Sequence, residues 1–329
     1  MTPHAAAERA GPAPSLTDVA GLLVGHATDE PGGTGCTVVL APPEGMPCTA
    51  FVRGRATGSR ELDACRPDAL AGRIDAIVLT GGSAYGLAAA DGVARWLAAQ
   101  GRGFPVGPVT VPIVPAAVVF DLAPCGSPHA RPDAAMGEAA CAAAGRVVLE
   151  GSVGAGTGAT VGKALGPANA MKGGVGTWSV RAGGVVVGAL VVVNAFGDVT
   201  DGAGTILAGA RTADGALADA AAYLARGGEP FGALARAAHQ TTLVVVASDA
   251  ALDRLALGGV ARAAADGLAR RIVPVGTAFD GDVVFACSAG RAEGTALQVE
   301  QLARQAVETA VERAVRAARG RDGIPGLGG

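Results

Sequence analysis

Residues Ala238 to Asp249 have the sequence AHQTTLVVVASD, in which a polar stretch leads directly into an apolar, β-branched run. Such a run is typical of a buried strand, so Thr241 stands at the entrance of a predicted strand. If the backbone were opened before Thr241, this residue would carry a free α-amine beside its hydroxyl group. The amine titrates near roughly pH 8 and can accept the hydroxyl proton. Thr241 is therefore either an ordinary strand residue or the nucleophile of a self-cleaving amide hydrolase.

Composition limits the class of protein. The chain has 329 residues, enough for a large core, and its 50% hydrophobic and 3% aromatic content means that small and branched side chains must fill that core. A net charge of −3 without a basic cluster argues against a nucleic-acid partner. The longest apolar run, Val185 to Val193, is far shorter than the ~20 residues of a membrane span. Residues 1–15 do not resemble a secretory signal, so we expect a cytoplasmic protein without a membrane partner.

The cysteines and histidines do not suggest a metal centre. No two cysteines form a C-x-x-C pair, and the four histidines are scattered along the chain. A zinc site needs clustered ligands, so we expect buried, reduced thiols and no metal. The cysteines concerned are Cys36, Cys48, Cys65, Cys125, Cys141 and Cys287.

The order of predicted elements favours an α+β fold. Residues 1–16 are rich in Ala and Pro and predict a loose N-terminal arm, and residues 17–329 predict a single domain. Residues 198–240 are Gly-rich and predict a mobile linker with one helix. Strands come in adjacent pairs with helices grouped between them, which indicates α+β layering. Strands are expected at 36–41, 48–52, 75–80, 174–181, 185–194, 241–249 and 283–288, an edge strand or extended loop at 109–115, and helices at 84–100, 133–144, 217–225, 252–271 and 295–319.

A glycine-rich loop at residues 151–163 invites a phosphate-site hypothesis, which its spacing contradicts. A Walker A motif needs Gly where Thr157 stands and Ser or Thr where Ala164 stands. The dinucleotide fingerprint fails as well, because its third Gly is replaced by Ala159. What remains is Lys163 at the end of the loop, a cation that would keep a neighbouring amine neutral.

Three further motifs have both a local and a chemical interpretation. The stretch Gly81 to Gly86 resembles the serine-nucleophile turn G-x-S-x-G, but its last Gly arrives one residue late, so Ser83 is better explained as a helix cap. Asn194 ends a predicted strand, where its amide either caps a turn or donates to an oxyanion. Asp280 and Asp282 flank one Gly before another strand, which is either a plain turn or a coupled carboxylate pair.

The order of these motifs along the chain resembles that of a known family. The chain resembles the self-processing L-aminopeptidase/D-esterase family (DmpA type) over residues 20–320. That family includes β-peptidyl aminopeptidases and the nylon-oligomer (6-aminohexanoate oligomer) hydrolase. The resemblance is carried by residues 24–28 (VGHAT), 79–87 (LTGGSAYGL), 111–122 (VPIVPAAVVFDL), 154–163, 191–198 (VVVNAFGD), 241–249 and 280–286 (DGDVVFA).

The resemblance implies a four-layer αββα sandwich of the N-terminal-nucleophile type, without a cofactor. It implies self-cleavage between Gln240 and Thr241 into a larger subunit, 1–240, and a smaller one, 241–329. It also implies small amide or peptide substrates, such as 6-aminohexanoate oligomers or β-peptides, and a homo-oligomer of cleaved heterodimers, expected to be a tetramer.

The resemblance also assigns the site residues. Thr241 becomes the nucleophile and, after cleavage, supplies its own α-amine as base. Asn194 serves the oxyanion, Lys163 adjusts and positions the amine, and Asp280 and Asp282 assist activation and self-cleavage. Phe120, Ser83 and Gly82 are expected to contact substrate.

Two residues depart from the family pattern. Gln240 stands where Asn or Gly is frequent, and Phe120 stands where some members have a tyrosine hydroxyl. These departures favour one alternative, a non-catalytic ligand-binding or scaffold protein of the same fold. A second alternative, a serine hydrolase that uses Ser83, stays open separately.

Overall fold

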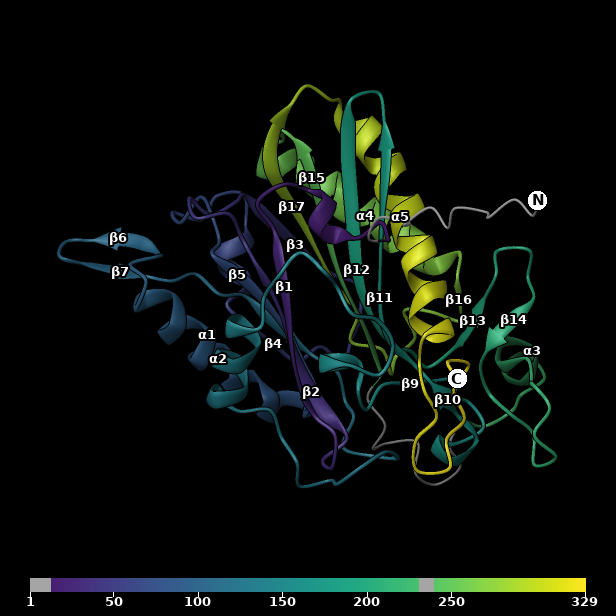
Figure 1. Ribbon diagram of the computed structural model, residues 1–329. Coiled ribbons are helices and arrows are strands. Elements are labelled where there is room, and N and C mark those ends of the chain that lie inside the picture. Colours follow the sequence, from purple (N-terminus) through teal and green to yellow (C-terminus); the bar gives the residue numbers. More distant parts are fainter. Residues whose placement is uncertain (1–12, 231–239) are drawn as a thin grey trace, which may run out of the picture.

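The computed structural model describes residues 13–230 and 240–329, and its centre is a pair of packed five-stranded sheets (Figure 1). The first sheet has the strand order β1-β2-β5-β8-β4 and the second has the order β11-β12-β15-β17-β3. The strands of the first sheet are β1 (Leu23–Asp29), β2 (Thr34–Leu40), β5 (Ala76–Thr80), β8 (Ala116–Val118) and β4 (Ser59–Arg60). Those of the second are β11 (Gly174–Ala182), β12 (Val185–Asn194), β15 (Thr241–Ala250), β17 (Val283–Ala292) and β3 (Cys48–Val52).

Helices cover the outer face of each sheet. The helices α1 (Ala89–Ala98) and α2 (Ala134–Ala142) pack on the first sheet, and α4 (Arg254–Ala269) and α5 (Ala296–Arg316) pack on the second. Figure 1 shows the resulting order of layers, helix–sheet–sheet–helix. The predicted four-layer αββα sandwich is confirmed.

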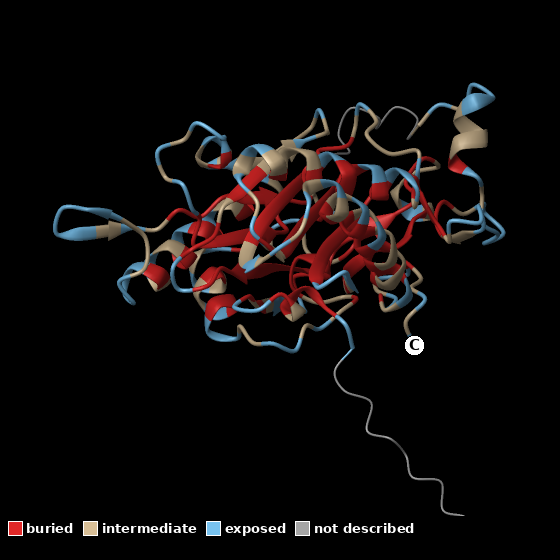
Figure 2. Ribbon diagram, turned by 90° about the horizontal axis from the view of Figure 1, so that it is seen from above, coloured by how far each residue is buried: buried red, intermediate tan, exposed pale blue. Residues whose placement is uncertain are grey.

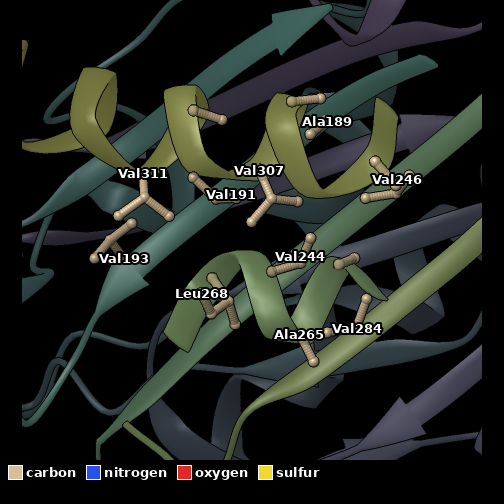
Figure 3. Close-up of a cluster of buried hydrophobic side chains, with 14 of the residues drawn as sticks. Ala189, Val191, Val193, Val244, Val246, Ala265, Leu268, Val284, Val307 and Val311 are labelled. Atoms are coloured by element: carbon tan, nitrogen blue, oxygen red, sulfur yellow. The ribbon is translucent and has the colours of Figure 1, made fainter. Parts of the chain in front are cut away.

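The apolar run after Thr241 has both of its faces buried. Leu243 and Val245 belong to the core between the two sheets, whereas Val244 and Val246 belong to the core under α4 and α5. A strand buried on both faces needs no polar alternation, which explains the continuous β-branched run. Figure 2 shows these strands as the buried centre of the molecule, and Figure 3 shows Val244 and Val246 in the cluster with Val307 of α5.

Smaller elements surround this centre. The hairpin β6 (Phe104–Val106) and β7 (Val109–Val111) projects from the body (Figure 1). Of the predicted edge strand or extended loop, residues 109–111 form a strand of this hairpin and residues 112–115 have no regular secondary structure. The predicted strands 36–41 and 48–52 both form, but they belong to different sheets, as β2 and β3. The remaining elements are β9 (Thr160–Val161), β10 (Met171–Lys172), β13 (Asp198–Thr200), β14 (Ile206–Ala208), β16 (Ile272–Val273), α3 (Ala220–Ala225) and the 3₁₀ helices Leu16–Asp18, Leu62–Cys65, Ser83–Ala88, Gly154–Gly156 and Pro167–Asn169.

The segment predicted to be a linker contains two strands and a helix between residues 198 and 225. Its first strand, β13, pairs with both β14 and β16. The buried carboxylate of Asp198 accepts hydrogen bonds from the Ala210 and Ala220 N–H groups, at 2.8 Å each, which ties the segment together. The rest of the predicted linker, 231–239, and residues 1–12 of the predicted arm lie outside the described residues. Leu16, the last arm residue, is fully buried.

The contact between α5 and β11 depends on a residue without a side chain. A Cβ atom at Gly176 would lie 2.0 Å from the Ala310 carbonyl oxygen. We expect Gly176→Ala to lower the free energy of unfolding by about 1–3 kcal/mol, the usual cost of overpacking. Urea denaturation measures the change. Gly72→Ala is the matched control, because nothing lies within 4 Å of a Cβ at that position, and equal stabilities of the two variants would contradict the prediction.

Candidate active site

Strand register brings the predicted site residues together at one end of the second sheet. Thr241, the first residue of β15, pairs with Asn194, the last residue of the antiparallel strand β12. On the other side, β17 runs parallel to β15, so the residues that precede it lie beside Gln240, and Gln240 forms a bridge with Asp280. Gln240, Thr241 and Asn194 are all nearly inaccessible to solvent. The site therefore lies in the buried end of a sheet and not in a surface loop.

The peptide bond before Thr241 has an unusual set of contacts. The Thr241 hydroxyl donates to the Gln240 carbonyl oxygen at 2.6 Å, and the Gly281 N–H donates to the same oxygen, also at 2.6 Å. Two donors on one carbonyl oxygen polarise it and would stabilise negative charge on it. A Cβ atom at Gly281 would lie 2.8 Å from the Thr241 Oγ1 atom and 2.5 Å from the Ala56 carbonyl oxygen, so only glycine fits beside the hydroxyl group.

Lys163 reaches the site from the end of the glycine-rich loop. Its Nζ donates to the Asn194 carbonyl oxygen at 3.0 Å and to Asn194 Oδ1 at 2.8 Å, and it also donates to Gln240 Oε1. Burial lowers the pKa of Lys163 well below its ordinary value, while the negative charge of Asp280 acts in the opposite direction. All three donors of the ammonium group have acceptors, which is the condition for holding a charge in a dry interior.

Asn194 is oriented by its neighbours. Its Oδ1 atom accepts from Lys163 and from the Thr160 N–H at 3.0 Å, so its Nδ2 atom points the other way. Nδ2 donates to the Phe120 carbonyl oxygen at 3.1 Å. Because an amide carries two N–H donors, one remains for a further acceptor.

The two aspartates hold their protons more tightly than usual. Burial, and then the charge of Asp280, raise the pKa of Asp282 to about 7, and burial also raises the pKa of Asp280. Asp280 accepts from the Thr277 N–H and hydroxyl at 2.8 and 2.7 Å. Asp282 Oδ1 accepts from the Thr242 N–H at 2.7 Å, and its Oδ2 atom has no partner among the described residues. Asp282 is thus a buried carboxyl group with a raised pKa, hydrogen-bonded to the residue that follows Thr241.

A pocket gives access to Thr241 from outside. It has a volume of about 280 Å³. Its lining residues are Arg55, Ala56, Thr57, Gly58, Ser83, Ala84, Val118, Phe120 and Thr241. Two of the expected substrate contacts, Phe120 and Ser83, therefore lie in the same pocket as Thr241, whereas Gly82 does not line it.

The structure corrects the interpretation of the Gly81–Gly86 stretch. Ser83 is not the helix cap, because Gly82 occupies that position and Ser83 begins the 3₁₀ helix in the left-handed region, at φ +53°. The N–H groups of Gly82 and Ser83 are not free for a ligand, since they donate to Asp121 Oδ1 at 2.6 Å and to the Val119 carbonyl oxygen at 3.0 Å. Among the residues described, no hydrogen bond joins the Ser83 hydroxyl to a histidine or a carboxylate, as a serine nucleophile would need.

The sequence did not reveal two further buried ionisable residues, Lys172 and Asp121. Lys172 is fully buried and donates to the Thr157 carbonyl oxygen at 2.7 Å, and burial lowers its pKa to about 8. Asp121 accepts from Gly82 N–H and from the Thr34 hydroxyl, and burial raises its pKa to about 6. Asp121 lies in a sequence block that carried the family resemblance and Lys172 lies outside these blocks, but nothing local marks either residue as buried. Gly281 was missed for the same reason.

Other expectations concern metals and membranes. All six cysteines are buried and unpaired. Across residues 13–230 and 240–329 no group of three or more metal-binding side chains comes together. In the same ranges, no helix combines the length and the apolar character that a membrane crossing requires.

Comparison with known proteins identifies the class of this chain. Its fold is similar to that of the L-aminopeptidase D-Ala-esterase/amidase of Ochrobactrum anthropi, a variant of the N-terminal-nucleophile (Ntn) hydrolase fold. The TM-score is 0.66 at 21% identity, and the match covers 94% of this chain and 88% of that one. The fold is thus that of an Ntn hydrolase.

Sequence comparison then gives the family. Residues 14–325 match Peptidase family S58, and the chain belongs to this family. It is 46% identical over 290 residues to an uncharacterized aminopeptidase of Mycobacterium bovis, covering 84% of this chain and 81% of that protein. It is 30% identical over 275 residues to the 6-aminohexanoate-oligomer endohydrolase of Agromyces sp. (strain KY5R), covering 82% and 73%. The protein is a peptide or amide hydrolase, as the resemblance implied.

The carboxyl group of Asp282 makes a testable contribution to stability. Its pKa is raised in the folded protein, so the folded state binds more protons than the unfolded state between about pH 4 and pH 7. This contribution therefore favours folding below pH 4 and is lost as the pH rises to 7, by up to about 1.4 kcal/mol per pH unit. We expect the difference in unfolding free energy, Asp282→Asn minus wild type, to grow from pH 4 to pH 7 in urea titrations. A difference independent of pH would contradict the raised pKa.

Proposed function

We propose that the protein is a self-processing Ntn hydrolase that cleaves its own backbone between Gln240 and Thr241. The new N-terminal Thr241 then attacks the carbonyl carbon of a substrate amide. The observation that carries this proposal is the geometry of one bond: the Thr241 hydroxyl and the Gly281 N–H both contact the Gln240 carbonyl oxygen, inside a buried site.

In the precursor, Thr241 Oγ1 forms a bond to the Gln240 carbonyl carbon, and the Gly281 N–H stabilises the resulting oxyanion. The hydroxyl proton needs a base, and Asp282, bonded to the Thr242 N–H and with a pKa raised to about 7, is suited to accept it. The C–N bond then breaks as the nitrogen takes up a proton, which leaves an ester on Oγ1 and a free α-amine. Water hydrolyses the ester and releases the Gln240 carboxylate.

In the mature enzyme, the α-amine of Thr241 accepts the proton of its own hydroxyl group. A positive charge on the nearby Lys163 disfavours protonation of this amine and so keeps the base neutral. The remaining N–H of Asn194 serves the oxyanion of the substrate. As the substrate C–N bond breaks, its nitrogen takes the proton held by the α-amine and departs as the free amine. Water then hydrolyses the acyl ester on Oγ1 and releases the carboxylic acid.

Substrates of this reaction are small amides and peptides. The relative that acts on 6-aminohexanoate oligomers suggests that extended, non-standard amides are included. We also propose that cleaved heterodimers assemble into a homo-oligomer, expected to be a tetramer, in the cytoplasm. Phe120 cannot donate a hydrogen bond from its side chain, so in this chain its carbonyl oxygen and ring contribute to the site instead.

Processing is tested by mass spectrometry and N-terminal sequencing. Purified wild-type protein is expected to give fragments 1–240 and 241–329, with Thr241 as the new N-terminus. Thr241→Ala, which lacks the nucleophile, should remain a single chain without amidase activity, and Thr241→Ser should still be cut. An active wild-type protein that stays intact would rule out the proposed mechanism and favour Ser83, which covalent labelling with a serine-reactive probe and peptide mapping would identify. An intact and inactive protein would favour the non-catalytic alternative.

Two variants of Asn194 test its N–H donor separately from its oxygen acceptor. Asn194→Ala removes both, and we expect turnover to fall about 10²-fold, the usual cost of one oxyanion donor. Asn194→Asp keeps an acceptor for Lys163 and Thr160 but lacks the N–H group, so its turnover should fall by a similar factor. Steady-state kinetics with processed protein provides the measurement. Turnover of Asn194→Asp equal to that of wild type would show that the side chain acts only through Lys163.

A further inference from the structure

The pocket in front of Thr241 has an uneven distribution of charge. Of the residues that line this pocket, Arg55 carries a charged side chain, and none is Asp or Glu. Thr57, another lining residue, has a buried hydroxyl oxygen without a partner in the part of the chain that the structure describes. The pocket thus offers a guanidinium group and hydroxyl groups to a ligand, and no anion.

The main chain of Arg55 is held firmly while its side chain is free to bind. The N–H groups of Arg55 and Ala56 donate to the Asp280 carbonyl oxygen at 2.7 and 3.0 Å, which fixes this segment beside Gly281 and the nucleophile. The side chain is exposed at the pocket, and it takes part in none of the ion pairs within residues 13–230 and 240–329. Arg60, a few residues away, is paired with Asp91 at 2.6 Å.

The carboxylates closest to Thr241 along the sheet do not face this pocket. Asp280 and Asp282 are 1% and 0% exposed. The Asp280 oxygens accept from Thr277 and from the Phe196 N–H, and Asp282 Oδ1 accepts from the Thr242 N–H. Asp282 Oδ2, which has no hydrogen-bond partner among the described residues, is buried as well. Asp121 is 2% exposed and is occupied by Gly82 and Thr34. A substrate ammonium group in the pocket would therefore meet Arg55 and find no carboxylate to neutralise it.

We propose that this pocket selects amides that carry a carboxylate group close to the scissile bond, bound by Arg55, and disfavours those with a free amine at that position. The proposal rests on Thr241 being the nucleophile, because that assignment makes this pocket the substrate site. Guanidinium and carboxylate groups match in geometry and form charge-assisted hydrogen bonds, and the Thr57 hydroxyl can donate to the same anion.

Three p-nitroanilides of similar size and different charge test the proposal: glutaryl (anionic), pentanoyl (neutral) and 4-aminobutyryl (cationic). Processed wild-type protein should hydrolyse them with kcat/KM falling in that order. Arg55→Met should lower kcat/KM for the glutaryl compound about tenfold, mainly through KM, and leave the pentanoyl value within about twofold. Arg55→Glu should reverse the order. Arg60→Met is the matched control, since Arg60 is also an exposed arginine but lines no part of this pocket, and it should behave as wild type.

A binding measurement separates this proposal from the proposed chemistry. Thr241→Ala lacks the nucleophile and is used for calorimetric titrations. Glutaric acid monoamide should bind to this variant, and 4-aminobutyramide should bind more weakly. The double variant Thr241→Ala, Arg55→Met should not bind glutaric acid monoamide. If none of the anilides is hydrolysed but this binding pattern holds, the catalytic assignment fails and the pocket assignment stands. Preference for the 4-aminobutyryl compound, or Arg55 variants indistinguishable from wild type with all three anilides, would overturn the pocket assignment.

Discussion

The register between β12 and β15 is the constraint on which the site depends. Pairing of Asn194 with Thr241 places the end of one strand against the start of the next, and the parallel neighbour β17 places the 280–282 turn beside Gln240. A shift of one residue in this pairing would turn every side chain of β15 to the opposite face, which would exchange Leu243 and Val245 for Val244 and Val246 between two tightly packed cores. Hydrophobic burial on both faces of the sheet therefore fixes the position of Thr241.

This architecture holds an unusual number of ionisable groups away from water. Lys163, Lys172, Asp121, Asp280 and Asp282 are all nearly or fully buried, and burial shifts the pKa of each of them toward the neutral form. Their hydrogen bonds to backbone groups compensate part of the desolvation cost. Pairs of groups with shifted pKa values are suited to proton transfer near neutral pH. Burial of these groups lowers stability and brings no obvious benefit for folding. It is consistent with a hydrolytic role.

The contacts of Gln240 show how the departure at position 240 is accommodated. The Gln240 Oε1 atom turns toward Lys163 and completes that ammonium group's set of acceptors. The bridge to Asp280 and the Gly281 N–H hold the main chain of Gln240, independently of its side chain. The hydrogen bonds to the Gln240 carbonyl oxygen thus come from Thr241 and Gly281, and the side chain of residue 240 affects the environment of Lys163.

Much of the fold was predictable from local pattern. Continuous apolar runs and helical periodicity located β12, β15, α4 and α5 to within a few residues, because long, buried elements leave a strong signal. The order of motifs was sufficient to recognise the family and, through it, the αββα layering and the membership of Thr241, Asn194, Lys163 and Asp280 in one site. Short elements such as β13 and β14, and the separation of β2 from β3 into different sheets, were not predictable, since a few residues of strand acquire their partners only in the folded chain.

By itself, the sequence determined which residues carry reactive groups and which segments must be buried. The tertiary structure decided how these groups meet: that the Gly281 N–H lies on the Gln240 carbonyl oxygen, that Ser83 takes a left-handed conformation instead of capping a helix, and that Arg55 faces the pocket while Asp280 and Asp282 turn away from it. Hydrogen-bond direction, burial and charge neighbourhood depend on contacts between residues far apart in the chain. No local stretch of sequence encodes these contacts, because they arise only when the two sheets pack and the strand ends converge.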